Sequence, residues 1–124
     1  MAYHVYIRLM QSSLYDAIEE GDIHACISLL EHGVTVDYWT WLTAIHYNQI
    51  DICKLFIDGG YIDVNIANNG WAAIHEVALC NHVDLCRVLL DRKVDTTMRN
   101  QLGDIPLEIA THHETGVALL LNSR

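Results

Sequence analysis

Three segments of the chain share one arrangement of apolar and polar residues. They run over residues 21–30, 48–57 and 81–90, and each has a cysteine at its sixth place. The third, fifth, sixth, ninth and tenth places are apolar in all three segments, which is the spacing of one face of an α-helix. The pattern therefore predicts three similar amphipathic helices.

The cysteines of these segments give the repeat length. Cys26, Cys53 and Cys86 are 27 and 33 residues apart, and such intervals are typical of solenoid repeats. Equivalent positions of packed helices lie about 8–10 Å apart, too far for a relaxed disulfide. Because cysteine behaves as a small apolar residue in protein interiors, we expect all three to be buried and structural. The fourth cysteine, Cys80, lies outside this pattern.

Each predicted helix is followed by a similar exit. Gly33 and Gly60 follow the first two helices, where glycine supplies the left-handed conformation that ends a helix. Lys93 takes this place after the third helix, and we expect local strain there. A short extended return and a second, shorter helix follow, and Pro106 suits the first position of the last of these helices.

These units resemble ankyrin repeats, whose unit of about 33 residues opens with Gly-x-Thr-Pro-Leu-His-x-Ala. The third unit opens with Asn69-Gly-Trp-Ala-Ala-Ile-His75, and the fourth with Gly103-Asp-Ile-Pro-Leu-Glu-Ile-Ala110. The resemblance implies an all-α ankyrin solenoid of stacked helix-turn-helix units with short hairpin returns. We assign residues 12–124 to an ankyrin repeat domain of about four repeats, one of them shortened, and residues 1–11 to an N-terminal extension or cap.

The second unit is short by about one helical turn, and it can be aligned in two ways. In the first, Thr43-Ala-Ile-His46 is the opening tetrapeptide, and the first helix is almost lost before Gln49. In the second, Trp41 takes the leucine position of the tetrapeptide, the helix is kept and the preceding hairpin is shortened. We prefer the first alignment, because Ala-Ile-His recurs at residues 73–75.

Both ends of the chain depart from the repeat. Near the N-terminus, apolar residues alternate as they would in a strand, although an extra cap or a loose tail fits equally well: Tyr3, Val5, Ile7 and Leu9. Ser12-Ser13 predicts the N-cap of the helix that follows. The last unit, residues 111–121, is compressed, and we expect its adjacent His112 and His113 at the surface.

The charge balance excludes some classes of partner. The chain has 16 Asp and Glu residues against 7 Lys and Arg, a net charge of −9, which argues against nucleic acid. No apolar run approaches the roughly 18 residues of a membrane span, and the start lacks the basic-then-apolar order of a secretory signal. We expect a soluble monomer in the cytoplasm, with the nucleus as an alternative.

The acids are concentrated in one part of the chain. Residues 9–53 contain seven acids and no Lys or Arg. These acids form either a solvated surface or a face that steers a basic partner.

Candidate chemical sites have simpler explanations. His75, Cys80, His82 and Cys86 are residue types that bind zinc, but the resemblance assigns His75 to hydrogen bonding between repeats, His82 to a turn and Cys86 to the core. No base and orienting group accompany a serine nucleophile, and there is no glycine-rich phosphate loop. We therefore predict no metal, no cofactor and no catalytic activity.

What remains is recognition of another protein. In ankyrin arrays the hairpin tips and the inner face of the first helices form a concave binding surface, and Trp and Tyr are frequent anchors at interfaces. The resemblance places nine residues there: Tyr38, Trp39, Trp41, Tyr47, Asn68, Asn69, Trp71, Arg99 and Asn100. Packing in the core is the alternative for Trp41 and Trp71.

The predicted function is a non-catalytic protein-interaction module, an adaptor or an inhibitor, whose protein partner carries a basic patch. One alternative is a regulatory or capping unit within a larger assembly. Another is a viral or bacterial mimic of host ankyrin proteins.

Overall fold

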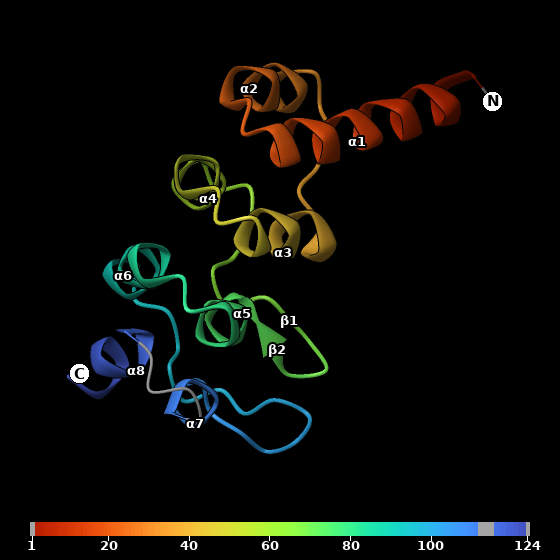
Figure 1. Ribbon diagram of the computed structural model, residues 1–124. Helices are drawn as coiled ribbons and strands as arrows, with labels where there is room; N and C mark the ends of the chain where they lie inside the picture. The colour runs from red at the N-terminus through yellow and green to blue at the C-terminus, as the bar shows by residue number, and fades with distance from the viewer. Residues whose placement is uncertain (1, 112–115, 124) are drawn as a thin grey trace. The chain divides into compact units, whose positions relative to one another are not determined.

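The computed structural model describes residues 2–111 and 116–123, so the two histidines at positions 112 and 113 lie outside the described residues. The chain divides into two compact units, Met1–Ile62 and Asp63–Arg124. Each unit contains two helix pairs (Figure 1). The predicted all-α architecture of helix pairs is confirmed.

The first unit is built from four helices. They are α1 (Ala2–Glu20), α2 (Ile23–Glu31), α3 (Tyr38–His46) and α4 (Ile50–Asp58). Helix α1 packs against α2 and α3, and α4 packs against both α2 and α3. The core between them contains the fully buried side chains of Leu14, Ile18, Trp41, Ile45 and Phe56.

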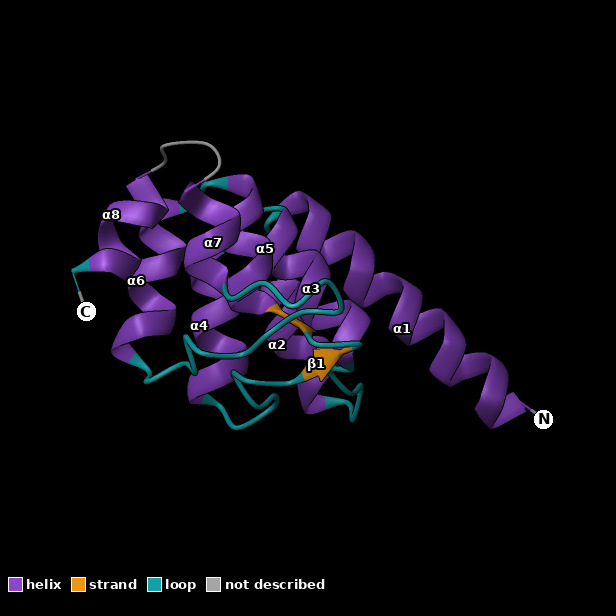
Figure 2. Cartoon of the chain, turned by 90° about the horizontal axis from the view of Figure 1, so that it is seen from below, coloured by secondary structure: helices purple, strands orange, loops and turns teal. Residues whose placement is uncertain are grey.

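The second unit combines a short hairpin with four helices. Its elements are β1 (Ala67–Asn68), β2 (Trp71–Ala72), α5 (Ala73–Cys80), α6 (Val83–Asp91), α7 (Pro106–Thr111) and α8 (Gly116–Asn122). The two strands pair antiparallel, and positive φ angles of 52° at Asn69 and 79° at Gly70 give the turn that suits a two-residue hairpin. Helix α5 packs against α6 and α7, and α8 packs against all three (Figure 2). Pro106 opens α7, as predicted.

The cysteine pattern predicted the second helix of each of the first three pairs correctly, although α1 with 19 residues and α3 with nine are not shorter than α2 and α4, which have nine each. Cys26, Cys53 and Cys86 lie on α2, α4 and α6, and all three are buried and form no disulfide. Burial, with a contribution from the charge of Asp22, raises the pKa of the Cys26 thiol to about 11, and burial also raises the pKa of Cys53. Such thiols are poor nucleophiles at neutral pH, which agrees with a structural role.

Left-handed residues end the helices at regular positions. After the first helix of each of the first three pairs they are Gly21 (φ 70°), Asn48 (57°) and Asn81 (58°), and after the second Gly33 (93°), Gly60 (75°) and Lys93 (60°). Lysine is the exception in this series, because a Cβ crowds the left-handed conformation and lysine lacks the short polar side chain by which asparagine tolerates it. The backbone at Lys93 therefore has the strained left-handed conformation that the sequence predicted.

The second repeat keeps its first helix, so our preferred alignment is wrong. Helix α3 spans nine residues and starts from Asp37, whose Oδ1 accepts a hydrogen bond from the Thr40 N–H at 2.8 Å. Trp41 is fully buried on this helix, as the second alignment requires, and the left-handed Asn48 and Asn81 are a normal 33 residues apart. The residues that this repeat lacks are those of a hairpin before α3. The helix can start without a hairpin, because Asp37 caps it directly after a short connection.

The N-terminal segment is helical. Helix α1 is continuous from Ala2 to Glu20, so the strand-like alternation was misleading and Ser12-Ser13 is not an N-cap. The Ser13 hydroxyl instead donates to the Leu9 carbonyl at 2.9 Å within the helix. The first turns of α1 project beyond α2 and α3 (Figures 1 and 2), which leaves Val5 and Leu9 exposed. The division at residue 12 stays a prediction.

None of the helices among the described residues combines the length and the hydropathy needed to span a bilayer.

Candidate protein-interaction surface

Two exposed aromatic side chains of the first unit, Trp39 and Tyr47, lie at the two ends of α3. Trp39 is 58% exposed, and its ring meets the ring of Tyr38 edge-on at a centroid distance of 4.9 Å. Tyr47, which is 49% exposed, follows the other end of the helix. Its hydroxyl donates to the Glu19 carboxylate at 3.5 Å, so an aromatic side chain and an acid of α1 meet at the surface.

The acids of the first unit are all on the outside. The seven acids between Leu9 and Cys53 are exposed: Asp16, Glu19, Glu20, Asp22, Glu31, Asp37 and Asp51. Asp22 and Asp37 are N-caps of α2 and α3, so these two have a structural role. The first unit holds eight Asp or Glu against two Lys or Arg, a net charge of −6, whereas the second unit carries −3 from eight acids and five bases.

Two of the predicted tryptophans differ from Trp39. Trp41 is 0% exposed, which corrects its assignment to the interaction surface: α3 turns this position into the core of the first unit. Trp71 is half-buried and stacks on the His75 ring, with centroids 5.3 Å apart and an interplanar angle of 28°. Its packing within the second unit leaves only part of its ring open.

His75 connects the start of α5 to the segment before α7, as the resemblance implied. The Ala72 N–H donates to Nδ1 at 3.0 Å, which leaves the proton on Nε2, and that nitrogen donates to the Met98 carbonyl at 2.9 Å. Burial lowers the pKa of His75, against the opposing effect of its hydrogen bond to Met98. Both ring nitrogens are therefore engaged in a neutral, structural imidazole.

The hairpin tip and the loop before α7 are in contact in the second unit. Asn68 and Asn69 are exposed at the tip. A Cβ at Gly70 would lie 2.5 Å from the Arg99 carbonyl oxygen and 3.0 Å from the Asn100 Cα. This close approach allows only glycine at position 70, and it brings the predicted residues of the tip and of the loop together.

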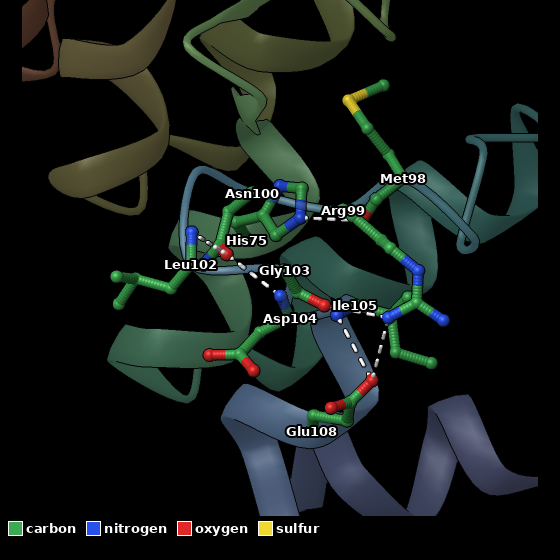
Figure 3. A network of polar contacts seen from close by, with 9 residues as sticks. All are labelled: His75, Met98, Arg99, Asn100, Leu102, Gly103, Asp104, Ile105 and Glu108. Atoms are coloured by element: carbon green, nitrogen blue, oxygen red, sulfur yellow. Dashed lines mark hydrogen bonds and ion pairs between the residues drawn. The ribbon is translucent and has the colours of Figure 1, made fainter.

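Arg99 and Asn100 have internal partners, although both were predicted as contact residues. The Arg99 guanidinium donates to the Gly103 carbonyl at 2.7 Å and lies 3.6 Å from the Glu108 carboxylate. The Asn100 side chain accepts from two backbone N–H groups of the same loop (Figure 3). Leu102 at the tip of this loop was missed, although a leucine within a run of polar and glycine residues was the available signal.

Comparison with known proteins identifies the family. The family described as "Ankyrin repeats (3 copies)" matches residues 9–100 and 41–124, which together span most of the chain. The chain therefore belongs to the ankyrin repeat family. Repeats of this family are in general protein-interaction modules and are typically not catalytic.

One curated relative is the "E3 ubiquitin-protein ligase KEG" of Arabidopsis thaliana. It is 41% identical to this chain over 59 residues, which are 46% of the chain. The matched segment is 4% of that protein's length, so the likeness concerns a small part of a much larger protein.

Proposed function

We propose that this chain is a non-catalytic module that binds a partner protein carrying a basic patch. The contact is made by an acidic–aromatic surface, defined as Glu19, Glu20, Tyr38, Trp39 and Tyr47. Asn68 and Asn69 of the hairpin tip add a second contact region. An adaptor or an inhibitor would both act in this way, by occupying the partner.

The observation that supports this proposal is the exposure of Trp39 in an acidic unit. A tryptophan that is 58% exposed leaves a large apolar ring in water, and desolvation of such a ring is a common source of binding energy. The edge-on contact with Tyr38 favours one orientation of the ring, so less side-chain entropy is lost on binding.

The acids support the nature of the partner. The first unit carries a net charge of −6, and Glu19 and Glu20 are exposed at the end of α1. Exposed charges of one sign raise the association rate of a partner of opposite sign. The hydrogen bond from the Tyr47 hydroxyl to the Glu19 carboxylate places one of these charged groups next to an aromatic contact residue.

The test is affinity capture on the immobilised chain, with Trp39→Ala and a matched control. Tyr61→Ala is the control, because Tyr61 is a 40% exposed aromatic residue of the same unit outside α3. We expect one protein in stoichiometric amount on the wild-type chain and on Tyr61→Ala, and its loss on Trp39→Ala. Equal retention by all three chains would contradict the choice of surface. Concentration-dependent self-association without a partner would favour a capping unit of an assembly instead.

A further inference from the structure

The turn of the β1–β2 hairpin (Figure 1) contains a reactive pair of residues. Asn69 is followed by Gly70, and it is the only asparagine of the chain that precedes a glycine. In such a pair the glycine nitrogen can attack the asparagine side chain, because no Cβ on the second residue hinders the approach. An Asn-Gly pair by itself does not define a site, so the surroundings of the Gly70 nitrogen decide whether the folded chain reacts.

Three exposed asparagines share the left-handed conformation and differ in the backbone N–H that follows them. Asn48, Asn69 and Asn81 have φ angles of 57°, 52° and 58°. The residues after Asn48 and Asn81 each donate their N–H to a carbonyl of the preceding helix, at 3.1 Å in both cases. In the part of the chain that the structure describes, the Gly70 N–H has no hydrogen-bond partner within the protein, and neither has the Asn69 side chain.

This difference matters because the nucleophile is the Gly70 nitrogen after loss of its proton. Hydroxide removes the proton, the nitrogen forms a bond to Cγ of Asn69, and the Cγ–Nδ2 bond breaks with release of ammonia. Water then opens the cyclic succinimide at one or the other of its carbonyls, which leaves aspartate or isoaspartate at position 69. A proton held in a hydrogen bond to a helix carbonyl is harder to remove, so Asn48 and Asn81 are protected.

The type of turn helps the ring to close. The strands pair Asn68 with Trp71, and the φ angles of 52° and 79° at Asn69 and Gly70 are those of a type I′ turn. Types I′ and II′ share a positive φ at the first central residue and differ in the orientation of the peptide plane between the central residues. Rotation of this plane redirects the Gly70 nitrogen relative to the Asn69 side chain, and glycine tolerates both signs of φ.

We propose that Asn69 is a site of non-enzymatic deamidation in the folded chain, and that isoaspartate at this position separates the hairpin from the loop before α7. Isoaspartate carries the backbone through Cβ, which lengthens a loop whose two residues set the strand register. The lengthened loop cannot keep its close contact, because a Cβ at Gly70 would already lie 2.5 Å from the Arg99 carbonyl oxygen. This site does not depend on the proposed function.

Ageing of the purified full chain at neutral and at mildly alkaline pH tests the site. Peptide mass spectrometry follows deamidation, methylation by an isoaspartate methyltransferase identifies isoaspartate, and an unstructured peptide of residues 66–73 sets the time scale. We expect conversion at position 69 in proportion to hydroxide concentration, with Asn48 and Asn81 intact. An unmodified Asn69 when the peptide is fully converted, or equal conversion at the three asparagines, would overturn the proposal.

Gln49→Gly separates the effect of the hydrogen bond from that of the dipeptide. The variant gives Asn48 a following glycine, while the N–H at position 49 keeps its carbonyl acceptor on α3. In the folded variant, conversion at Asn48 should be about 2- to 10-fold slower than at Asn69, the range of one hydrogen bond, and in urea the two rates should be equal. His82→Gly makes the same change at Asn81 and keeps the comparison if the first variant does not fold. Equal rates in the folded chains would overturn the role of the free N–H.

Hydrogen exchange tests the structural consequence. In the isoaspartate form, isolated by chromatography, we expect faster amide exchange in residues 67–72 and 99–104 and unchanged exchange in the first unit. Asn69→Asp adds the charge without lengthening the backbone, so it is the matched control and should exchange as the wild type does. Equal exchange in the isoaspartate form and in Asn69→Asp would overturn this part of the proposal. The capture experiment with Trp39→Ala has an independent outcome, so failure of one proposal is distinguishable from failure of the other.

Discussion

At the scale of single residues, the two tryptophans of α3 have opposite environments. Trp39 and Trp41 are two positions apart, which places their side chains about 200° apart around a helix with 3.6 residues per turn. One ring is therefore 58% exposed and the other 0%. The phase of the helix separates a candidate contact residue from a core residue of the same type.

Protonation of His75 should destabilise the fold. The folded state holds His75 neutral, with Nδ1 accepting from Ala72 and a pKa below its usual value. The unfolded chain therefore binds more protons below about pH 7, so stability falls as the pH falls from 7.5 to 5.5. Urea unfolding at both pH values should show a smaller loss for His75→Asn, which cannot titrate. An equal loss in both chains would contradict this explanation.

Replacing Lys93 by glycine should stabilise the protein. Lys93 has a φ of 60°, a conformation that costs about 1–2 kcal/mol for a residue with a Cβ, while glycine loses more entropy on folding. We expect a net gain of about 0.5–1 kcal/mol in the free energy of unfolding, measured by urea denaturation. Lys54→Gly, on an exposed position of α4, is the control and should lower stability by about 1 kcal/mol. A less stable Lys93→Gly chain would show that the strain is absent.

At the scale of elements, a side chain of α1 supports the connection at which the second repeat lacks a hairpin. The connection between α2 and α3 has no hairpin, and the Gln11 side chain of α1 reaches it instead. The Gln11 amide nitrogen donates to the Thr35 carbonyl at 3.1 Å and to the Thr40 hydroxyl at 3.2 Å. Thr40 in turn donates to Asp37, the N-cap of α3. One long helix therefore supports the shortened connection.

Removal of the Gln11 side chain should weaken this support. Gln11→Ala loses both hydrogen bonds to the α2–α3 connection, and each such bond contributes about 1 kcal/mol, less where water can replace the partner. We expect a decrease of about 1–2 kcal/mol in unfolding free energy, together with faster amide exchange in residues 35–40. Ser12→Ala, an exposed position on the same helix, should change neither quantity. Matching effects of the two variants would exclude the support role.

Sequence patterns predicted some elements and not others. The helices with a cysteine in the same place were found because burial and the helical period agree at each of them. Helix α3 was misplaced because Ala44-Ile-His46 resembles the start of α5, whereas the decisive feature was Asp37, which can cap a helix without a preceding hairpin. The start of α1 was ambiguous because an exposed helical segment has no buried face to impose the 3.6-residue period.

At the scale of the whole molecule, the charge and the candidate contacts are unevenly divided. Most of the net charge belongs to the first unit, and so do the exposed aromatic residues Trp39 and Tyr47. The composition and the run of acids were visible in the sequence. The surface position of Trp39 was predicted as well, since Trp39 was chosen as a contact residue. The burial of Trp41 and the fixed loop under Leu102 were not visible, because they depend on helix phase and on hydrogen bonds between residues of one loop.

The central claim is that acids of the first unit steer a basic partner and Trp39 retains it. The most direct measurement is the association and dissociation kinetics of the captured protein at low and at physiological salt. Glu19→Gln with Glu20→Gln should slow association and flatten its salt dependence, because exposed charges act over a Debye length of about 8 Å. Asp84→Asn with Asp91→Asn, the same change in charge on α6 of the second unit, should have a smaller effect.

Trp39→Ala should leave association nearly unchanged and accelerate dissociation, by a cost of about 1–3 kcal/mol in binding free energy. Together these results would show steering by the acids and retention by the aromatic ring. Association that is insensitive to the glutamate pair at low salt would make the acids a solvated surface only. Normal dissociation of Trp39→Ala would place the binding surface elsewhere and contradict the account.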